Sequence, residues 1–298
     1  MRAIAVTLVT LFHLNIQSLA GGYIGVDIFF VISGFLISSI IWTKKSRGEF
    51  RLRDFYLGRI RRLLPPLYAT VLVTFVAAGF ILLPDDFARF SRSAIATLFS
   101  VSNILFYFEA GYWDTSSHLK PLLHTWSLGV EEQFYLIWPL FIIFCATTLR
   151  RVPFVLILLL VSGLSTWAML WYSGRDISGA FYLFPFRVFQ FSLGALVAFA
   201  AQLAFIRAPL RVPLLSDLCA VTGLALIGYS TLTLGATTPF PGINALPPTL
   251  AAMLLLYAGS RPSGQGTLGR LLLTNPLSVF LGKISYAAYL VHWPIIVL

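Results

Sequence analysis

Long apolar segments separated by short polar stretches run along the whole chain. Most approach the roughly 20 residues that an α-helix needs to cross the hydrocarbon core of a bilayer. Helices are the expected form, because a backbone that faces lipid must satisfy its hydrogen bonds within its own segment. The segments lie at about 3–20, 22–43, 63–83, 94–108, 126–148, 153–172, 180–202, 217–235, 245–259 and 284–298. The pattern predicts an all-α, polytopic integral membrane protein with about nine or ten transmembrane helices in one domain, residues 1–298.

Composition strengthens this prediction and excludes other classes. The 298 residues are 58% hydrophobic and only 11% charged, whereas a soluble domain carries about a quarter charged residues. A soluble globular protein, a disordered chain and a disulfide scaffold are therefore excluded. Cys145 and Cys219 lie in or beside apolar segments and imply no disulfide. The net charge is +10, but the basic residues flank hydrophobic segments instead of one soluble face, which argues against nucleic-acid binding.

Clusters of Lys and Arg predict which helix ends face the cytoplasm. Residues 44–62 hold the densest cluster, so we expect this loop inside, with the N-terminus also cytoplasmic. Further inside loops are marked by Arg150 with Arg151, Arg207 with Arg211, and Arg261 with Arg270.

The segment 94–108 conflicts with this orientation. Between the inside positions Arg62 and Arg150 the chain must cross the membrane an even number of times, yet three apolar segments lie there. Because 94–108 is short and contains polar residues, we expect it to be re-entrant, interfacial or packed inside the protein, with the loop 109–125 outside. The alternative is that Arg150 and Arg151 are an exception to the charge rule.

Ionisable groups inside apolar segments are costly and mark functional sites by default. Arg2 and His13 are separated by ten residues, a spacing that puts both on one helix face, with Arg2 near the cytoplasmic surface and His13 well into the membrane. An imidazole with an unperturbed pKa near 6.5 accepts a proton near neutrality, as a general base must. The structural alternatives are an anchoring role for Arg2 and an interhelical hydrogen bond for His13.

Later segments add carboxylates and a further cation. Asp27 lies in the second segment, where an unpaired carboxylate would be costly. Glu131 shares a helix face with Tyr135, whereas Glu132 points about 100° away. Arg187 needs an acidic partner, and either Asp27 or Glu131 would serve.

A basic stretch that includes Arg59, Arg61 and Arg62 precedes the third segment. Guanidinium groups match phosphate oxygens with paired hydrogen bonds, so this cluster could hold a phosphorylated cytoplasmic ligand. On charge count alone, anchoring to anionic lipid is the simpler explanation. No phosphate-binding loop, HExxH or Cys/His metal spacing occurs in the sequence, so no metal is expected.

Five short motifs follow one another along the chain. They are Arg2-x10-His13, GYIGVDIFFVISG at 22–34, Arg59-x-x-Arg62, WSLGVEEQFY at 126–135, and Ser285-Tyr286 through His292-Trp293-Pro294. In this order they resemble the membrane-bound acyltransferase 3 family. These are bacterial O-acetyltransferases that modify surface polysaccharides such as the O-antigen of lipopolysaccharide. The resemblance covers almost the whole chain.

The resemblance implies an activity and a location. Such proteins take an acyl group, usually acetyl, from acyl-coenzyme A on the cytoplasmic side and place it on a sugar hydroxyl at the outer face. Acetyl-CoA is thus the expected donor, and a carbohydrate acceptor and the lipid bilayer are the expected partners. The expected location is the bacterial inner membrane.

Site roles follow from the same resemblance. The expected catalytic group is His13, Glu131, Arg2 and Asp27; the coenzyme-binding group is Arg59, Arg61 and Arg62; the substrate-binding group is Trp126, Ser127, Tyr135, Arg187 and His292. His13 would activate the poorly nucleophilic hydroxyl as a base, and Glu131 or Asp27 would orient the imidazole or position the sugar. Whether transfer is direct or passes through an acyl-enzyme, on Ser127 or Tyr135, stays open.

The chain also departs from the family pattern. Gln190 stands where members commonly carry glutamate. The chain starts at Met1 and stops at Leu298 within its last segment, so we expect it to be incomplete at both ends and to carry no SGNH-type extracytoplasmic domain. The main alternative function is a proton-coupled transporter or flippase, which would use the same His, Glu and Arg residues as a relay. Inverted repeats would favour it, and none is detectable.

Overall fold

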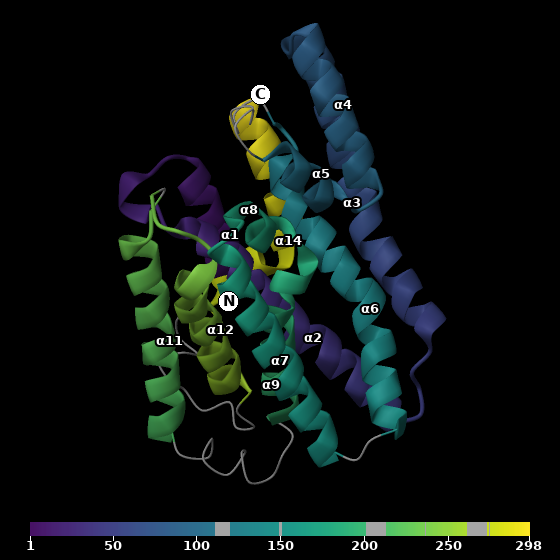
Figure 1. The fold of residues 1–298 in the computed structure, drawn as a ribbon, viewed down its shortest axis with the longest axis vertical. Helices are drawn as coiled ribbons and strands as arrows, with labels where there is room; N and C mark the ends of the chain where they lie inside the picture. The colour runs from purple at the N-terminus through teal and green to yellow at the C-terminus, as the bar shows by residue number, and fades with distance from the viewer. Residues whose placement is uncertain (111–119, 149–150, 201–212, 236, 261–272, 274) are drawn as a thin grey trace.

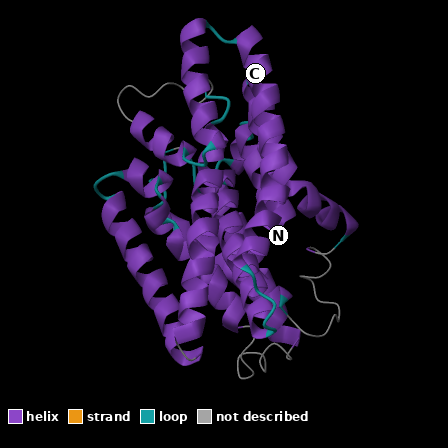
Figure 2. Ribbon diagram, turned by 90° about the vertical axis from the view of Figure 1, so that its right-hand side faces the viewer, coloured by secondary structure: helices purple, strands orange, loops and turns teal. Residues whose placement is uncertain are grey.

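The computed structural model shows a bundle of α-helices (Figures 1 and 2). It describes the chain except for residues 111–119, 149–150, 201–212, 236, 261–272 and 274, and the described part contains no strand. The helices are α1 (Arg2–His13), α2 (Gly25–Ser46), α3 (Leu52–Ile81), α4 (Pro84–Leu98), α5 (Ser102–Glu109), α6 (Trp126–Thr148), α7 (Arg151–Ser173), α8 (Ile177–Tyr182), α9 (Val188–Ala200), α11 (Pro213–Thr233), α12 (Leu246–Gly259) and α14 (Pro276–Val297). The predicted all-α fold is confirmed.

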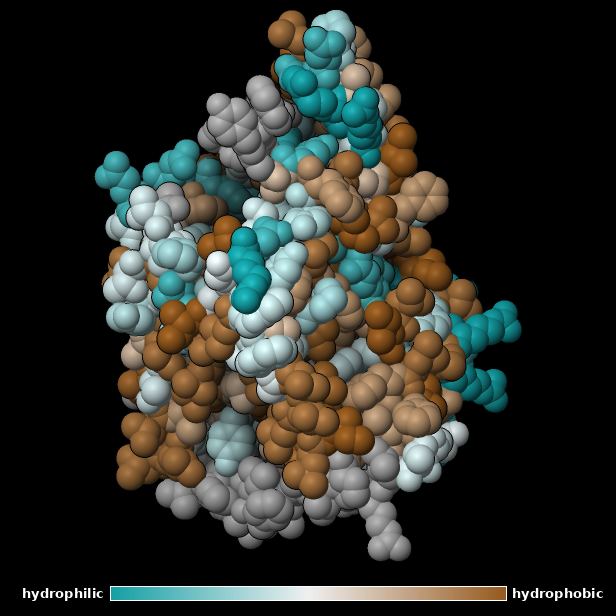
Figure 3. Space-filling view, in the orientation of Figure 1, coloured by the Kyte–Doolittle hydropathy of each residue, from teal (hydrophilic) through white to brown (hydrophobic). Residues whose placement is uncertain are grey.

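Seven helices of the described chain, α2, α3, α6, α7, α11, α12 and α14, are long and apolar enough to cross a membrane, and α1 and α9 are shorter apolar helices. Apolar side chains such as Leu72, Phe80, Phe144 and Trp167 lie exposed on the outside. Figure 3 shows hydrophobic surface over much of the lower part of the molecule. Exposed apolar surface of this extent marks a membrane protein. The chain is therefore a multi-pass membrane protein, while the total of nine or ten spans and the cytoplasmic N-terminus stay predictions.

Three predicted segments have different limits in the structure. The first was expected to reach residue 20, but α1 ends at His13, and Asn15 follows in the left-handed conformation with φ 56°. The basic stretch before the third segment is not a loop, because α3 already begins at Leu52. The segment 180–202 is broken into α8, a 3-10 turn at Phe184–Phe186 and α9, since Pro185 lacks the N–H that a continuous helix needs.

The segment 94–108 does not form one helix. Helix α4 ends at Leu98, Ser100 adopts a left-handed φ of 59°, and α5 begins at Ser102. Neither helix is among those long enough to cross a membrane, which agrees with the expectation that this segment is not a span. The long helices on either side, α3 and α6, run in opposite directions (Figure 1). Two such helices would supply the even number of crossings that the charge pattern predicts.

Most arginines used for the remaining orientation argument lie outside the described residues, namely Arg150, Arg207, Arg211, Arg261 and Arg270. About half of the loop 109–125 also lies beyond the described residues, because residues 111–119 are not described. Its predicted position on the outer side of the membrane therefore stays a prediction. The ends of α6, α9 and α12 and the beginnings of α7 and α11 lie together at the lower end of the bundle in Figure 1. This arrangement is consistent with one cytoplasmic end.

Helix α2 forms the centre of the bundle and packs closely against α9. A Cβ atom on Gly34 would lie 2.0 Å from the carbonyl oxygen of Phe191, and one on Gly194 would lie 2.1 Å from that of Val31. Only glycine allows two helix backbones to approach so closely. This close packing sets Asp27 of α2 beside the beginning of α9.

Helices α1, α2, α3, α6 and α14 surround the polar interior. On α2, the hydroxyl of Ser33 donates to Glu131 of α6. Five residues further along α2, the hydroxyl of Ser38 accepts from the indole of Trp138, which also lies further along α6. The two helices therefore run parallel. Helix α14 runs antiparallel to α6 and parallel to α1, with His292 beside His13. Polar residues far apart in the sequence are thereby brought together.

Candidate active site

The imidazoles of His13 and His292 are in direct contact. His13 Nδ1 lies 2.9 Å from His292 Nε2, and His292 Nδ1 lies 2.7 Å from the carbonyl oxygen of Tyr289. Because a carbonyl oxygen only accepts, the Nδ1 of His292 carries a hydrogen, and the Nε2 of the neutral ring is then an acceptor. His13 therefore donates from Nδ1, and its Nε2 is left with a free lone pair.

His13 lines a cavity of about 500 Å³, which we call the histidine cavity. Aromatic rings form most of its wall, including Trp126, Phe181, Phe240 and Trp293. Trp293 also packs against His13, with ring centroids 4.5 Å apart. The cavity lies within the usual size range for a small-molecule site. His13 is the last residue of α1 and half-buried, not a mid-helix residue as expected.

A buried ion pair forms another part of this cavity. Arg187 Nη1 lies 3.1 Å from Asp27 Oδ1, and Gln190 donates a hydrogen bond to the same carboxylate oxygen. Arg187 Nε also donates to the carbonyl oxygen of Phe181 at 3.0 Å. Of the two partners that the sequence left open for Arg187, the structure selects Asp27. The amide of Gln190, at the position where family members commonly carry glutamate, supplies a donor to the carboxylate of Asp27, which is only 2% exposed.

Glu131 lies in a different environment. Its Oε1 accepts hydrogen bonds from the hydroxyls of Ser33 and Tyr135. The carboxylate is thus committed to groups on α2 and α6. Neither Glu131 nor Asp27 contacts His13 in the structure; the group that orients the imidazole is His292, which was expected to bind substrate. A histidine carries out this role because its other nitrogen is fixed by a backbone carbonyl.

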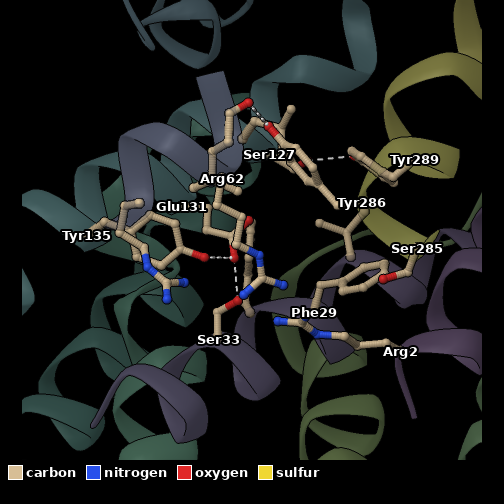
Figure 4. A pocket seen from close by; sticks show the side chains of 15 residues that line it. Arg2, Phe29, Ser33, Arg62, Ser127, Glu131, Tyr135, Ser285, Tyr286 and Tyr289 are labelled. Carbon is tan, nitrogen blue, oxygen red and sulfur yellow. Dashed lines mark hydrogen bonds between the residues drawn. The ribbon is translucent and has the colours of Figure 1, made fainter. Parts of the chain in front are cut away.

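Glu131 lines a second, narrower cavity of about 50 Å³, which we call the arginine cavity. Arg2, Arg59 and Arg62 also line it, and Figure 4 shows the guanidinium groups of Arg2 and Arg62 directed toward its middle. None of the three arginines forms an ion pair within the described chain, and the buried Nε of Arg59 has no hydrogen-bond partner there. Such a cluster attracts an anion.

Tyr289 and Val26 line both cavities and separate them. The hydroxyl of Tyr289 lies 2.6 Å from Ser127 Oγ (Figure 4). It also donates to the carbonyl oxygen of His124 at 3.0 Å. These bonds hold the phenol ring between the two spaces. The two sites are therefore neighbours that share a wall.

Comparison with known proteins places the chain in a family. A family model described as an acyltransferase domain matches residues 1–298. The chain belongs to the acyltransferase 3 family.

Relatives within this family include proteins from three bacteria. The peptidoglycan O-acetyltransferase OatA of Listeria monocytogenes is 31% identical, YrhL of Bacillus subtilis 34%, and the O-acetyltransferase OatA of Staphylococcus aureus 30%. Each match covers 100% of this chain but only 48–50% of the relative. The chain thus spans about half the length of these curated relatives. No solved structure matches it significantly.

The structure sorts the acyltransferase motif residues between the two cavities. Trp126 and Arg187 line the histidine cavity, and Ser127 and Tyr135 line the arginine cavity. Arg61 lines neither and is exposed on α3. One helical turn separates Arg59 from Arg62 on the same face, whereas Arg61 points elsewhere. The arginine pair, and not the whole cluster, belongs to the site.

Sequence reasoning missed four polar residues in and around the walls of the two cavities. They are Ser33, His124, Gln190 as a partner of Asp27, and Tyr289. Ser33 and Tyr289 lie within motifs that the sequence already showed, so the motifs pointed to the region but not to the contacts. His124 stands two residues before Trp126 and follows the polar loop, which concealed its burial.

Proposed function

We propose that this chain is an O-acyltransferase of the bacterial inner membrane that moves an acetyl group from acetyl-CoA to a carbohydrate hydroxyl. The observation that carries the proposal is the free lone pair of His13 Nε2 in a large cavity, which Tyr289 and Val26 separate from three unpaired guanidinium groups. The names of the Listeria and Staphylococcus relatives support acetyl as the group transferred. The Listeria name favours peptidoglycan, and not lipopolysaccharide, as the acceptor.

The arginine cavity suits the phosphate end of the donor. The diphosphate of coenzyme A is anionic, and Arg2, Arg59 and Arg62 offer guanidinium groups without carboxylate partners. Bidentate bonds from arginine fix phosphates in position. With the phosphates held at this end, the thioester would point toward Tyr289 and the histidine cavity beyond it.

The histidine cavity suits the acceptor and the chemistry. His13 Nε2 would take the proton of the acceptor hydroxyl while its oxygen attacks the thioester carbonyl. The C–S bond breaks, and the proton passes from His13 to the departing thiolate, giving an acetyl ester and free coenzyme A. His292 would hold the reactive tautomer throughout, as the carboxylate does in a Ser-His-Asp triad.

The direct test is acetyl transfer by the protein in lipid vesicles. Labelled acetyl-CoA and soluble peptidoglycan fragments are supplied, and labelled ester is measured. We expect transfer by the natural protein and a kcat lower by about 10²- to 10⁴-fold in His13→Gln, the usual contribution of a general base, with coenzyme A binding retained. Gln17→Ala, exposed just beyond α1, serves as the matched control and should match the natural rate. An unchanged rate in His13→Gln would exclude the base assignment.

The same preparation separates this proposal from a proton-coupled transporter. A transporter would move protons across the vesicle membrane without consuming acetyl-CoA. Proton flux that is independent of acetyl-CoA, together with no ester formation, would replace the acyltransferase proposal.

A further inference from the structure

His124 is the second histidine, besides His13, that lines the histidine cavity, and the proposed mechanism does not use it. It lies in the 3-10 turn Leu123–Thr125 before α6 and is 3% exposed. Its ring lies 5.5 Å from that of His292 and 5.6 Å from that of Tyr289 between centroids. Neither of its ring nitrogens has a hydrogen-bond partner within the described chain. The imidazole is thus fixed in place by packing, and its contact with the backbone of Leu290 is too poorly aligned to count as a well-formed hydrogen bond.

The backbone explains why this ring is held so firmly. The carbonyl oxygen of His124 accepts from the hydroxyl of Tyr289 at 3.0 Å and from that of Ser127 at 3.1 Å. The turn is therefore pinned to α14 and to the beginning of α6. The side chain is left to face the cavity that it lines.

Tyr23 is a second buried polar side chain in the wall of this cavity. It lies in the 3-10 turn Gly22–Ile24, directly before α2. Its ring is packed edge-on against Phe12 and Phe240, at centroid distances of 5.4 and 4.8 Å. Its hydroxyl is buried and has no hydrogen-bond partner in the described part of the chain. Tyr23 lines the same cavity as His124. Two polar side chains on different elements of one cavity wall therefore have buried polar atoms without a well-formed hydrogen bond in the described chain.

Buried polar groups in proteins are nearly always paired, because leaving them unpaired is unfavourable. Two such groups in one cavity indicate a site whose partner is a ligand. A neutral imidazole and a phenol each offer one donor and one acceptor, which matches a hydroxyl or an amide. The charged residues of the cavity wall, Asp27 and Arg187, neutralise each other, so the cavity favours a neutral polar ligand over an anion.

We infer that His124 and Tyr23 are positioning residues that bind the acceptor sugar, through a hydroxyl or amide next to the hydroxyl that is acylated. The inference rests on the proposed acyltransferase function and deepens it, because it assigns the sugar subsite. The aromatic wall, including Trp126 and Phe181, would cover the apolar faces of the sugar ring. His124 does not act on the proton; it sets which hydroxyl reaches His13.

The test measures the KM of each substrate separately in the vesicle assay. His124→Phe keeps a ring and removes both nitrogens, and Tyr23→Phe removes a single oxygen. We expect each variant to raise the KM for the peptidoglycan fragment about five- to 100-fold, the range for one lost hydrogen bond to a buried partner. The KM for acetyl-CoA should stay within about twofold, because the lost groups do not face the arginine cavity. His124→Gln should recover part of the acceptor affinity.

Stability supplies an independent readout. Because both substitutions remove unpaired buried polar atoms, the variants should melt at the natural temperature or above it when no acceptor is present. Tyr107→Phe is the matched control, since its hydroxyl is bonded to Asp176 at 2.9 Å outside both cavities. It should leave both KM values unchanged.

Several results would overturn the inference. One is an unchanged acceptor KM in both variants. Another is an equal rise in both KM values, which would indicate general distortion. A fall in kcat with a shifted pH profile and constant acceptor KM would place His124 in proton transfer. If His124→Phe does not fold, Tyr23→Phe alone decides. Failure of the proposed function looks different, because the natural protein itself would then form no ester.

Discussion

The two cavities share a wall but differ in charge, size and composition. The arginine cavity is about 50 Å³ and has three guanidinium groups against one carboxylate, and that carboxylate is bonded to two hydroxyls. The histidine cavity is about 500 Å³ and largely aromatic, and its one cation is paired with its one anion. In the first, positive charge is left unpaired; in the second, the unpaired groups are neutral.

This difference favours a different ligand class for each cavity, in agreement with the proposed function. Unpaired guanidinium groups at a predicted cytoplasmic end favour a phosphorylated ligand, whereas unpaired neutral donors among aromatic rings favour a carbohydrate. A transferase needs both ligands at once, with their reacting atoms within about 3.5 Å. Tyr289 occupies the place between them. The difference in charge between the two cavities also predicts which property changes when a charged residue of either cavity is replaced.

The largest effect is expected from upsetting the neutrality of the histidine cavity. Arg187 is 1% exposed and Asp27 is 2% exposed, so Arg187→Gln leaves a buried carboxylate without its cation. Loss of one partner of a buried pair costs about 3–5 kcal/mol. We expect a large fall in melting temperature and poor recovery of folded protein in detergent, measured by thermal unfolding and size-exclusion chromatography.

The matched double variant shows whether charge is the cause. Arg187→Gln combined with Asp27→Asn removes both charges and keeps polar groups of similar shape, so most of the lost stability should return. If the double variant is as unstable as the single one, the ion pair does not maintain this wall, and neutrality is not what distinguishes the cavity.

This ion pair also shows how far the sequence could predict the site. The residues that the motifs marked do lie together, and contacts within one helix, such as Glu131 with Tyr135, followed from helical spacing. Contacts between helices did not follow from spacing. The choice of Asp27 for Arg187 depends on the close packing of α2 on α9 at Gly34 and Gly194. That packing is a property of the folded bundle and not of either segment alone.

The fold shows the same division between local and tertiary information. Apolar length predicted the long helices, because the bilayer fixes the length of a span. Apolar length did not predict where helices are interrupted. The end of α1 at His13, the left-handed residue Ser100 and the turn around Pro185 were all missed. A single left-handed residue or a missing N–H is a local event that hydropathy does not register. His124 was missed because neighbouring helices, and not its own segment, bury it.

An effect of intermediate size is expected in the arginine cavity. Arg59→Ala combined with Arg62→Ala should weaken coenzyme A binding about tenfold or more, since each removes a charge-assisted hydrogen bond to phosphate. Acetyl-pantetheine, which lacks the nucleotide phosphates, should bind the natural protein and the variant alike. Affinities are measured by titration calorimetry in detergent, and added salt should reduce the difference.

Arg61→Ala is the matched control for this pair, because Arg61 is exposed on the same helix and lines neither cavity. It should leave coenzyme A affinity unchanged. An equal loss in Arg61→Ala would mean that the basic stretch acts through general attraction or lipid anchoring, and the separate charge character of the arginine cavity would not stand.

The smallest effect concerns the wall itself. Tyr289→Phe removes the hydroxyl that joins Ser127 and the carbonyl of His124, a change of about 0.5–1.5 kcal/mol in holding the ring. A looser ring admits water to the thioester, so acetyl-CoA hydrolysis should rise a few-fold relative to acetyl transfer, while both KM values change little. Tyr286→Phe loses a comparable bond, to the carbonyl of Leu63 at 2.9 Å, but lines only the arginine cavity. The ratio of hydrolysis to transfer should therefore rise in Tyr289→Phe and stay unchanged in Tyr286→Phe. An equal rise in both variants would mean that Tyr289 has no special role in the wall and that the two cavities function as a single space.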